Sequence, residues 1–159
     1  MKIALASAPA VTGEVEHNIV SILRFLEHCS GKADLVVFGE SFLQGFECLT
    51  WDYEADRVMA VSKEGAEIRR IREAAAKNRI AVSFGYIEKA ADSLYSSQIV
   101  IDASGEIIHN FQRVSAGWKE FWHTDGRYRE GRKFETFAFD GKKFAIGLCG
   151  DLWAEGRPE

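Results

Sequence analysis

The sequence is 159 residues long, carries a net charge of −4 and contains 47% hydrophobic and 28% charged residues. These values are typical of one soluble globular domain and exclude a disordered or low-complexity chain. No apolar run approaches the roughly 20 residues of a membrane-spanning helix, and the mild acidity argues against a nucleic-acid-binding protein. Three cysteines without a CxxC pair predict free thiols in a reducing, cytoplasmic compartment.

The first half of the chain predicts alternating strands and helices. Residues 3–7 and 35–38 are short apolar runs, as expected of buried strands. Apolar residues at helical spacing predict a helix over 14–30 and a second one over 62–78. The apolar positions are Val15, Ile19, Ile22, Leu23 and Leu26 in the first helix and Ile68, Ile71 and Ala75 in the second.

After residue 79 the pattern changes to consecutive strands. We expect them at 80–86, 95–102, 106–113, 134–139 and 143–149. Asp140-Gly141 lies between two alternating runs and strongly predicts a hairpin. The order of elements predicts an α/β fold with a layered sheet that carries helices on one face.

Cys149 is the first candidate for chemistry. It follows an apolar run and precedes Gly150, a pattern typical of a strand-end turn that exposes a nucleophile and directs backbone N–H groups at a reacting oxygen. The alternative is a buried structural cysteine, which is what most cysteines are.

Glu40 directly follows the apolar run at 35–38 and is the second candidate. A carboxylate at the end of a buried strand is costly to desolvate unless it is paired or used, for example as a general base. The alternative is a helix cap or a surface salt bridge. The four histidines lack the spacing of metal ligands, so we expect no metal.

Several segments together resemble the carbon–nitrogen hydrolase (nitrilase) superfamily. Residues 34–42 resemble the strand of that family that bears the catalytic glutamate, and 147–153 resemble its nucleophile elbow. The matching segments between them are 84–86, 94–97, 101–107 and the Tyr-x-x-Gly element at 128–131. They occur in the family's order and cover essentially the whole chain.

The resemblance implies a four-layer αββα sandwich, assembly into homo-oligomers, no cofactor, and hydrolysis of a small amide or, less favoured, a nitrile. Cys149 would attack the substrate carbon, Glu40 would act as the base, and the N–H of Gly150 would bind the oxyanion. Free cysteine titrates near 8.5, so the thiol needs a base or a cation at neutral pH. Preplaced oxyanion donors are each worth roughly 10²–10³ in rate.

The family's catalytic lysine aligns with Arg113, and the nearest lysine is Lys119. Arginine is a planar fork rather than a compact ammonium group, so we favour Lys119 and keep Arg113 as the alternative. Lys119 reaches the same position only if its loop folds back, which Gly117 permits. Glu120 is the candidate for the family's second glutamate.

The aromatic side chains in the expected loops predict a pocket but are equally compatible with ordinary core or a subunit contact. We place Phe46, Trp118 and Trp153 in the substrate pocket. Members of the family continue well past the nucleophile, so we expect residues 1–159 to form a single hydrolase domain that lacks its C-terminal part.

Two other functions stay open. The chain could be a non-catalytic relative that serves binding or assembly, which Arg113 and the short length favour. It could also be an unrelated α/β ligand-binding module, with a single open sheet and Cys149 merely packed.

Overall fold

The computed structural model describes residues 1–120, 122–154 and 157–158, with side chains up to Leu152. Its main element is a five-stranded sheet in the order β1-β2-β3-β4-β5. The strands are β1 (Ile3–Leu5), β2 (Leu35–Val37), β3 (Ala81–Ala90), β4 (Ser93–Ile101) and β5 (Ile107–Gln112). The first three strands are parallel, and β3, β4 and β5 are antiparallel.

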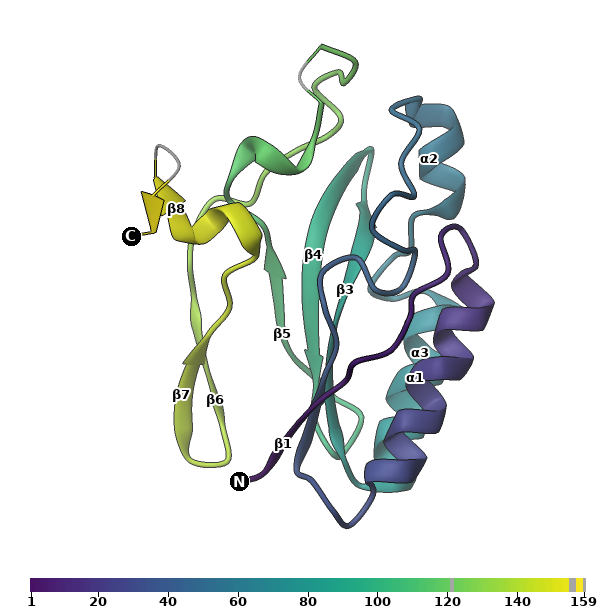
Figure 1. Ribbon diagram of the computed structural model, residues 1–159, viewed down its shortest axis with the longest axis vertical. Helices are drawn as coiled ribbons and strands as arrows, with labels where there is room; N and C mark the ends of the chain where they lie inside the picture. Colours follow the sequence, from purple (N-terminus) through teal and green to yellow (C-terminus); the bar gives the residue numbers. More distant parts are fainter. Residues whose placement is uncertain (121, 155–156, 159) are drawn as a thin grey trace.

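Helices cover one face of this sheet (Figure 1). The helices are α1 (Val15–Cys29), α2 (Tyr53–Met59) and α3 (Ala66–Asn78). Helices α1 and α3 bury Ile19, Ile22, Leu26, Ile68 and Ile71 in the core, together with apolar side chains of the sheet. This burial is the main source of stability for the helical layer.

A β-hairpin of β6 (Thr136–Phe139) and β7 (Lys142–Ala145) covers the opposite face (Figure 1). The Phe137 ring in β6 stacks on the His109 ring, with centroids 4.7 Å apart, and Phe134, just before β6, stacks on Phe111 with centroids 5.6 Å apart. The described residues therefore form three layers in the order helices, sheet and hairpin, which are three of the four layers expected. The short elements η1 (Ala116–Trp118), η2 (Cys149–Leu152), β8 (Trp153–Ala154) and β9 (Arg157–Pro158) lie beyond the sheet.

Most elements agree with the sequence-based prediction, and three differ. The helix expected from residue 62 begins at Ala66, with Gly65 as its N-cap, and α2 was not predicted. The strand expected over 143–149 ends at Ala145, so Cys149 lies in η2 rather than at a strand end. The predicted turn at Asp140-Gly141 is confirmed, because both residues adopt positive φ as a tight hairpin requires.

In the described part of the chain, no helix has the length and apolar character needed to span a bilayer.

Candidate active site

Glu40 lies where the β2 segment leaves the sheet. The chain beyond β2 still follows β3, because Phe38 N–H donates to the Ser83 carbonyl and Gly85 N–H to the Gly39 carbonyl. A Cβ atom on Gly85 would lie 2.3 Å from the Ser41 nitrogen and 2.7 Å from Glu40 Cα. Only glycine therefore allows this approach of the Glu40 backbone to β3.

Arg113, directly after β5, is 4% exposed and points at Glu40. Its Nη1 lies 2.7 Å from Glu40 Oε1, and its Nε donates to Ser115 Oγ at 2.8 Å. Ser96 Oγ also donates to Glu40 Oε1, at 3.2 Å. Glu40 thus accepts one charged and one neutral hydrogen bond, and its side chain is only 14% exposed.

Cys149 begins η2 with a φ of 41°, in the left-handed region that non-glycine residues rarely adopt. Its side chain is exposed. Backbone strain of this kind is typical of functional turns. A Cβ atom on the next residue, Gly150, would lie 2.7 Å from Arg113 Nη2, so the guanidinium packs directly against the turn.

Asp151 fixes this turn to the end of β5. Its Oδ1 accepts hydrogen bonds from the backbone N–H groups of Val114 and Ser115, and its Oδ2 accepts one from Leu148. A carboxylate that accepts three backbone hydrogen bonds is a strong anchor. Asp151 therefore sets the position of Cys149 relative to Arg113.

Lys119 lies in a different environment from Arg113. Its Nζ is 2.6 Å from Glu130 Oε1 and donates to the Tyr128 carbonyl at 2.9 Å. The Tyr128 hydroxyl in turn donates to buried Asp56 at 2.7 Å, and burial next to this carboxylate raises the pKa of Tyr128. Asp56 also accepts hydrogen bonds from Thr50 and from the Trp51 N–H, so it links the loop around residue 50 to the loop that carries Lys119.

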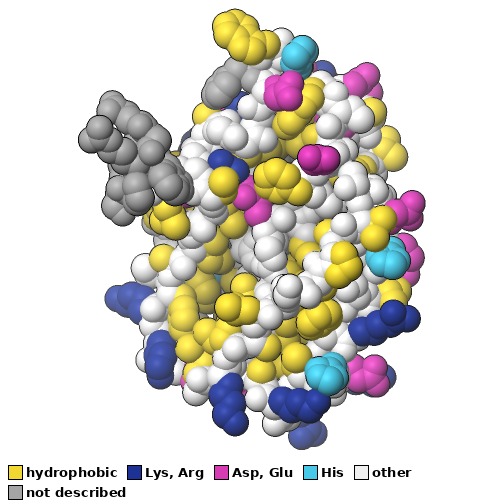
Figure 2. Space-filling model, viewed as in Figure 1, with side chains coloured by type: hydrophobic (Ala, Val, Ile, Leu, Met, Phe, Trp, Pro, Cys, Tyr) yellow, Lys and Arg dark blue, Asp and Glu magenta, His cyan; other side chains and the backbone are white. Residues whose placement is uncertain are grey.

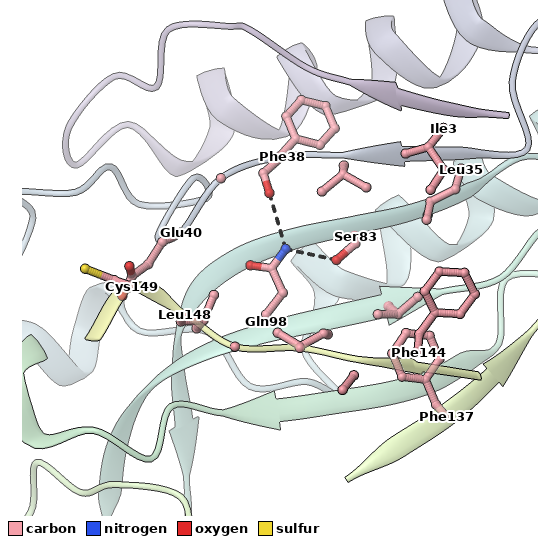
Figure 3. A pocket seen from close by; sticks show the side chains of 16 residues that line it. Ile3, Leu35, Phe38, Glu40, Ser83, Gln98, Phe137, Phe144, Leu148 and Cys149 are labelled. Carbon is pink, nitrogen blue, oxygen red and sulfur yellow. Dashed lines mark hydrogen bonds between the residues drawn. The ribbon is translucent and has the colours of Figure 1, made fainter. Parts of the chain in front are cut away.

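Two cavities meet at Cys149 and Glu40. The first, of about 360 Å³, lies among the loops and is also lined by Arg113, Ser96 and the side chains of Phe46, Trp51, Trp118, Glu47 and Glu120. The second, of about 430 Å³, lies between the sheet and the hairpin, and Figure 3 shows Glu40 and Cys149 at one end of it. Its walls are mainly apolar, and Gln98 crosses it to donate hydrogen bonds to Ser83 and the Phe38 carbonyl.

The structure thus brings together most of the residues that the sequence singled out. Glu40, Arg113, Cys149, Phe46, Trp118 and Glu120 all line the loop cavity. Gly150 adjoins Arg113, and Glu120 bonds His123 at 2.9 Å. Lys119 is not among the residues that line either cavity. The side chain of Trp153 lies outside the described residues.

Sequence reasoning missed Asp151, Asp56, Ser96 and the role of Gly85. The available signals were the position of Asp151 within the nucleophile turn and of Gly85 and Ser96 within matching segments; Asp56 gave none. The described residues contain no group of three or more histidine, cysteine or acidic side chains placed to hold a metal ion.

Comparison with known proteins defines the family. The carbon–nitrogen hydrolase family model matches residues 2–155, so the chain belongs to this family. A cyanide hydratase of Penicillium rubens is 29% identical over 126 residues, which are 72% of this chain and 35% of that protein. An (R)-stereoselective amidase of Pseudomonas sp. is 24% identical over 96% of this chain and 52% of its own length.

The solved structures agree on the fold. An amidase from Nesterenkonia sp. superposes with a TM-score of 0.77 at 21% identity, covering 96% of this chain and 56% of that one. The layered α/β fold of the nitrilase type is thereby confirmed. The chain spans about half or less of the length of these relatives.

Proposed function

We propose that this chain carries the active site of a carbon–nitrogen hydrolase that cleaves a small amide through a thioester on Cys149. The observation that carries the proposal is the convergence of Glu40, Arg113 and Cys149 on one cavity. These groups supply a base, a cation and a nucleophile, which are the three functions that acyl transfer needs.

In the proposed reaction, Glu40 takes the Cys149 thiol proton as sulfur attacks the amide carbon. The resulting oxyanion is stabilised by the Gly150 N–H and by a cation. The intermediate collapses, the C–N bond breaks, and the amine leaves with the proton from Glu40. Glu40 then deprotonates a water molecule, which attacks the thioester and releases the carboxylic acid and the regenerated thiol.

We propose Arg113 as the cation, in place of the Lys119 favoured from the sequence. Its ion pair with Glu40 and its contact with the Gly150 turn support this assignment. Lys119 is bonded to Glu130 and to the Tyr128 carbonyl, which supports a role in holding the loop. Glu120 stays a prediction as the second glutamate, supported by its place in the cavity wall.

An amide is favoured over a nitrile because amidase relatives match almost the whole chain in both sequence and structure. The amidase from Nesterenkonia sp. AN1 has been solved with butyramide bound and with acrylamide added to its active site cysteine. The nitrilases and cyanide hydratases among the relatives make nitriles the alternative substrate class.

The test is ammonia release from butyramide and butyronitrile, combined with hydroxylamine trapping of the acyl-enzyme as a hydroxamate. We expect both signals with butyramide and neither in Cys149→Ser. Ammonia from butyronitrile alone would assign the nitrile class. A folded chain that yields no ammonia and no hydroxamate from either compound would contradict the proposal and favour a non-catalytic relative.

Homo-oligomerisation and a cytoplasmic location stay predictions. On β1, Ile3 is 44% and Leu5 80% exposed, which supports contact with another surface. Mass measurement by light scattering tests the oligomeric state.

A further inference from the structure

We propose that the loop cavity at Cys149 selects amides that carry a positively charged group, such as an ammonium, a few methylenes from the scissile carbonyl. The inference rests on the proposed function and names its substrate class. Its basis is the charge of the cavity wall, in which Glu40, Glu47 and Glu120 face the single cation Arg113.

The charge of Arg113 is already engaged inside the wall. Its Nη1 pairs with Glu40 at 2.7 Å and its Nε bonds Ser115. Arg113 and Glu40 therefore largely neutralise each other in the resting site, and an incoming carboxylate would find no unengaged cation in the described lining. Arg113 becomes available to the oxyanion only when Glu40 takes the Cys149 proton.

Glu47 and Glu120 provide the remaining negative charge. Both residues are exposed, and Glu47 forms no salt bridge among residues 1–120, 122–154 and 157–158. Glu120 bonds the His123 ring through Oε2 at 2.9 Å. A cavity with two carboxylates in excess attracts cations and repels anions.

The aromatic part of the wall fits the same ligand. Phe46, Trp51 and Trp118 line the cavity beside the carboxylates. Aromatic faces attract ammonium groups and provide apolar surface for a methylene stem. The cavity volume of about 360 Å³ accommodates a small amide of this kind.

The molecular surface shows the same asymmetry (Figure 2). Acidic side chains lie in the upper part of this face, where Figure 1 places the loops after β5 and the loop before α2, and also along its right side. Lysine and arginine side chains gather along its lower edge. A cation approaching the site therefore meets mostly negative charge.

The first experiment probes the cavity without requiring turnover. Methanethiosulfonates transfer their thioalkyl group to a cysteine thiolate, forming a disulfide and releasing methanesulfinate. The cationic 2-(trimethylammonium)ethyl, the anionic 2-sulfonatoethyl and the neutral methyl reagents are compared at Cys149 by peptide mass spectrometry. Each rate is divided by that of the same reagent with 2-mercaptoethanol.

We expect a normalised cation-to-anion rate ratio of about ten at low salt, falling towards one at 0.5 M salt as the charges are screened. Glu47→Gln and Glu120→Gln should each lower the ratio about threefold. Glu27→Gln is the matched control, since it makes the same charge change on the exposed surface of α1, across the sheet. A ratio of one, or faster anionic labelling, would overturn the inference.

The second experiment compares hydrolysis of 4-aminobutyramide, pentanamide and succinamic acid, which are similar in size and differ in charge. We expect kcat/KM to be about tenfold higher for the cationic amide than for the neutral one, and lowest for the anionic one. Hydrolysis without this order would refute charge selection and leave the proposed function standing. Cation-selective labelling without hydrolysis of any amide would refute the proposed function and support the charged pocket.

Discussion

The two cationic side chains near the site, Arg113 and Lys119, differ in what places them. Arg113 directly follows β5, and its backbone is fixed by a hydrogen bond to the Ser96 carbonyl on β4. Lys119 follows η1 in a loop, where its partners Glu130 and Tyr128 come from the returning part of the same loop. A residue at a strand end is therefore placed by the sheet, whereas a residue in a loop is placed by whichever partner the loop offers.

The difference extends to what each cation does. The guanidinium forms separate bonds to Glu40 and Ser115 and also packs against Gly150, which a single ammonium could not do with the same geometry. The Lys119 ammonium holds the loop together. These contacts support our proposal that Arg113 belongs to the reacting site and Lys119 to the loop beside it.

Arg113→Met is expected to have one of the two largest effects. This change leaves the partly buried Glu40 without its ion-pair partner and should lower the free energy of unfolding by about 3 kcal/mol. Lys119→Met should cost only about 1 kcal/mol, because Glu130 is more exposed. Urea unfolding of both variants and of Arg113→Lys measures the difference. Equal losses of stability for the two methionine variants would contradict the different roles assigned to Arg113 and Lys119.

Gly85→Ala tests whether the Glu40 backbone needs its close approach to β3. The added methyl group would overlap Ser41 and Glu40, and we expect a loss of about 3 kcal/mol. Gly39→Ala is the matched control, since its Cβ meets no atom within 4 Å. If thermal unfolding shows the same stability for both variants, the account of how Glu40 is placed is incorrect.

Asp151→Asn tests the anchor between the Cys149 turn and the end of β5. The amide keeps the shape, but only its oxygen can accept, so at least one of the three backbone hydrogen bonds is lost and the others lose their charge assistance; we expect a loss of about 2 kcal/mol. Urea unfolding measures the loss. Asp52→Asn is the control, because asparagine caps a helix nearly as well as aspartate. An equal loss of stability in both variants would mean that Asp151 does not hold the Cys149 turn against the end of β5.

Tyr128→Phe has the smallest expected effect. It removes the hydroxyl group from Asp56 but leaves the bonds from Thr50 and Trp51, so the loss should be about 1 kcal/mol. Tyr95→Phe, at an only partly buried tyrosine, is the control and should change stability less. A thermal unfolding series with no difference between the two would show that Asp56 does not depend on Tyr128.

The regular part of the fold could be predicted from the sequence because its periodicity is plain. The apolar spacing of α1 and the Asp140-Gly141 turn each define one local structure. Helix α2 could not be predicted in this way, since it has seven residues and its Val58 is 82% exposed, which leaves no apolar stripe. Its only signal was the cap residue Asp52.

The candidate site was predictable where a motif coincides with a strand end. Glu40 and Arg113 are such residues, and the register of β2, β3, β4 and β5 brings them together. The position of Lys119 depends on how a loop closes on Glu130, which no local pattern encodes. The Cys149 turn lies beyond its strand because the pairing of β7 ends at Ala145, which lies opposite Thr136, the first residue of β6.

The central claim is that Glu40 activates Cys149, and alkylation tests it most directly. The rate of Cys149 modification by iodoacetamide is measured from pH 5 to 9 by peptide mass spectrometry, in the native chain and in Glu40→Gln. Cys48 serves as an internal reference, because burial raises the pKa of its thiol to about 11 and keeps it protonated over this range. We predict that Cys149 reacts faster at pH 7 than an ordinary thiol and that Glu40→Gln slows it. A rate equal to that of an ordinary thiol and indifferent to Glu40 would contradict the account.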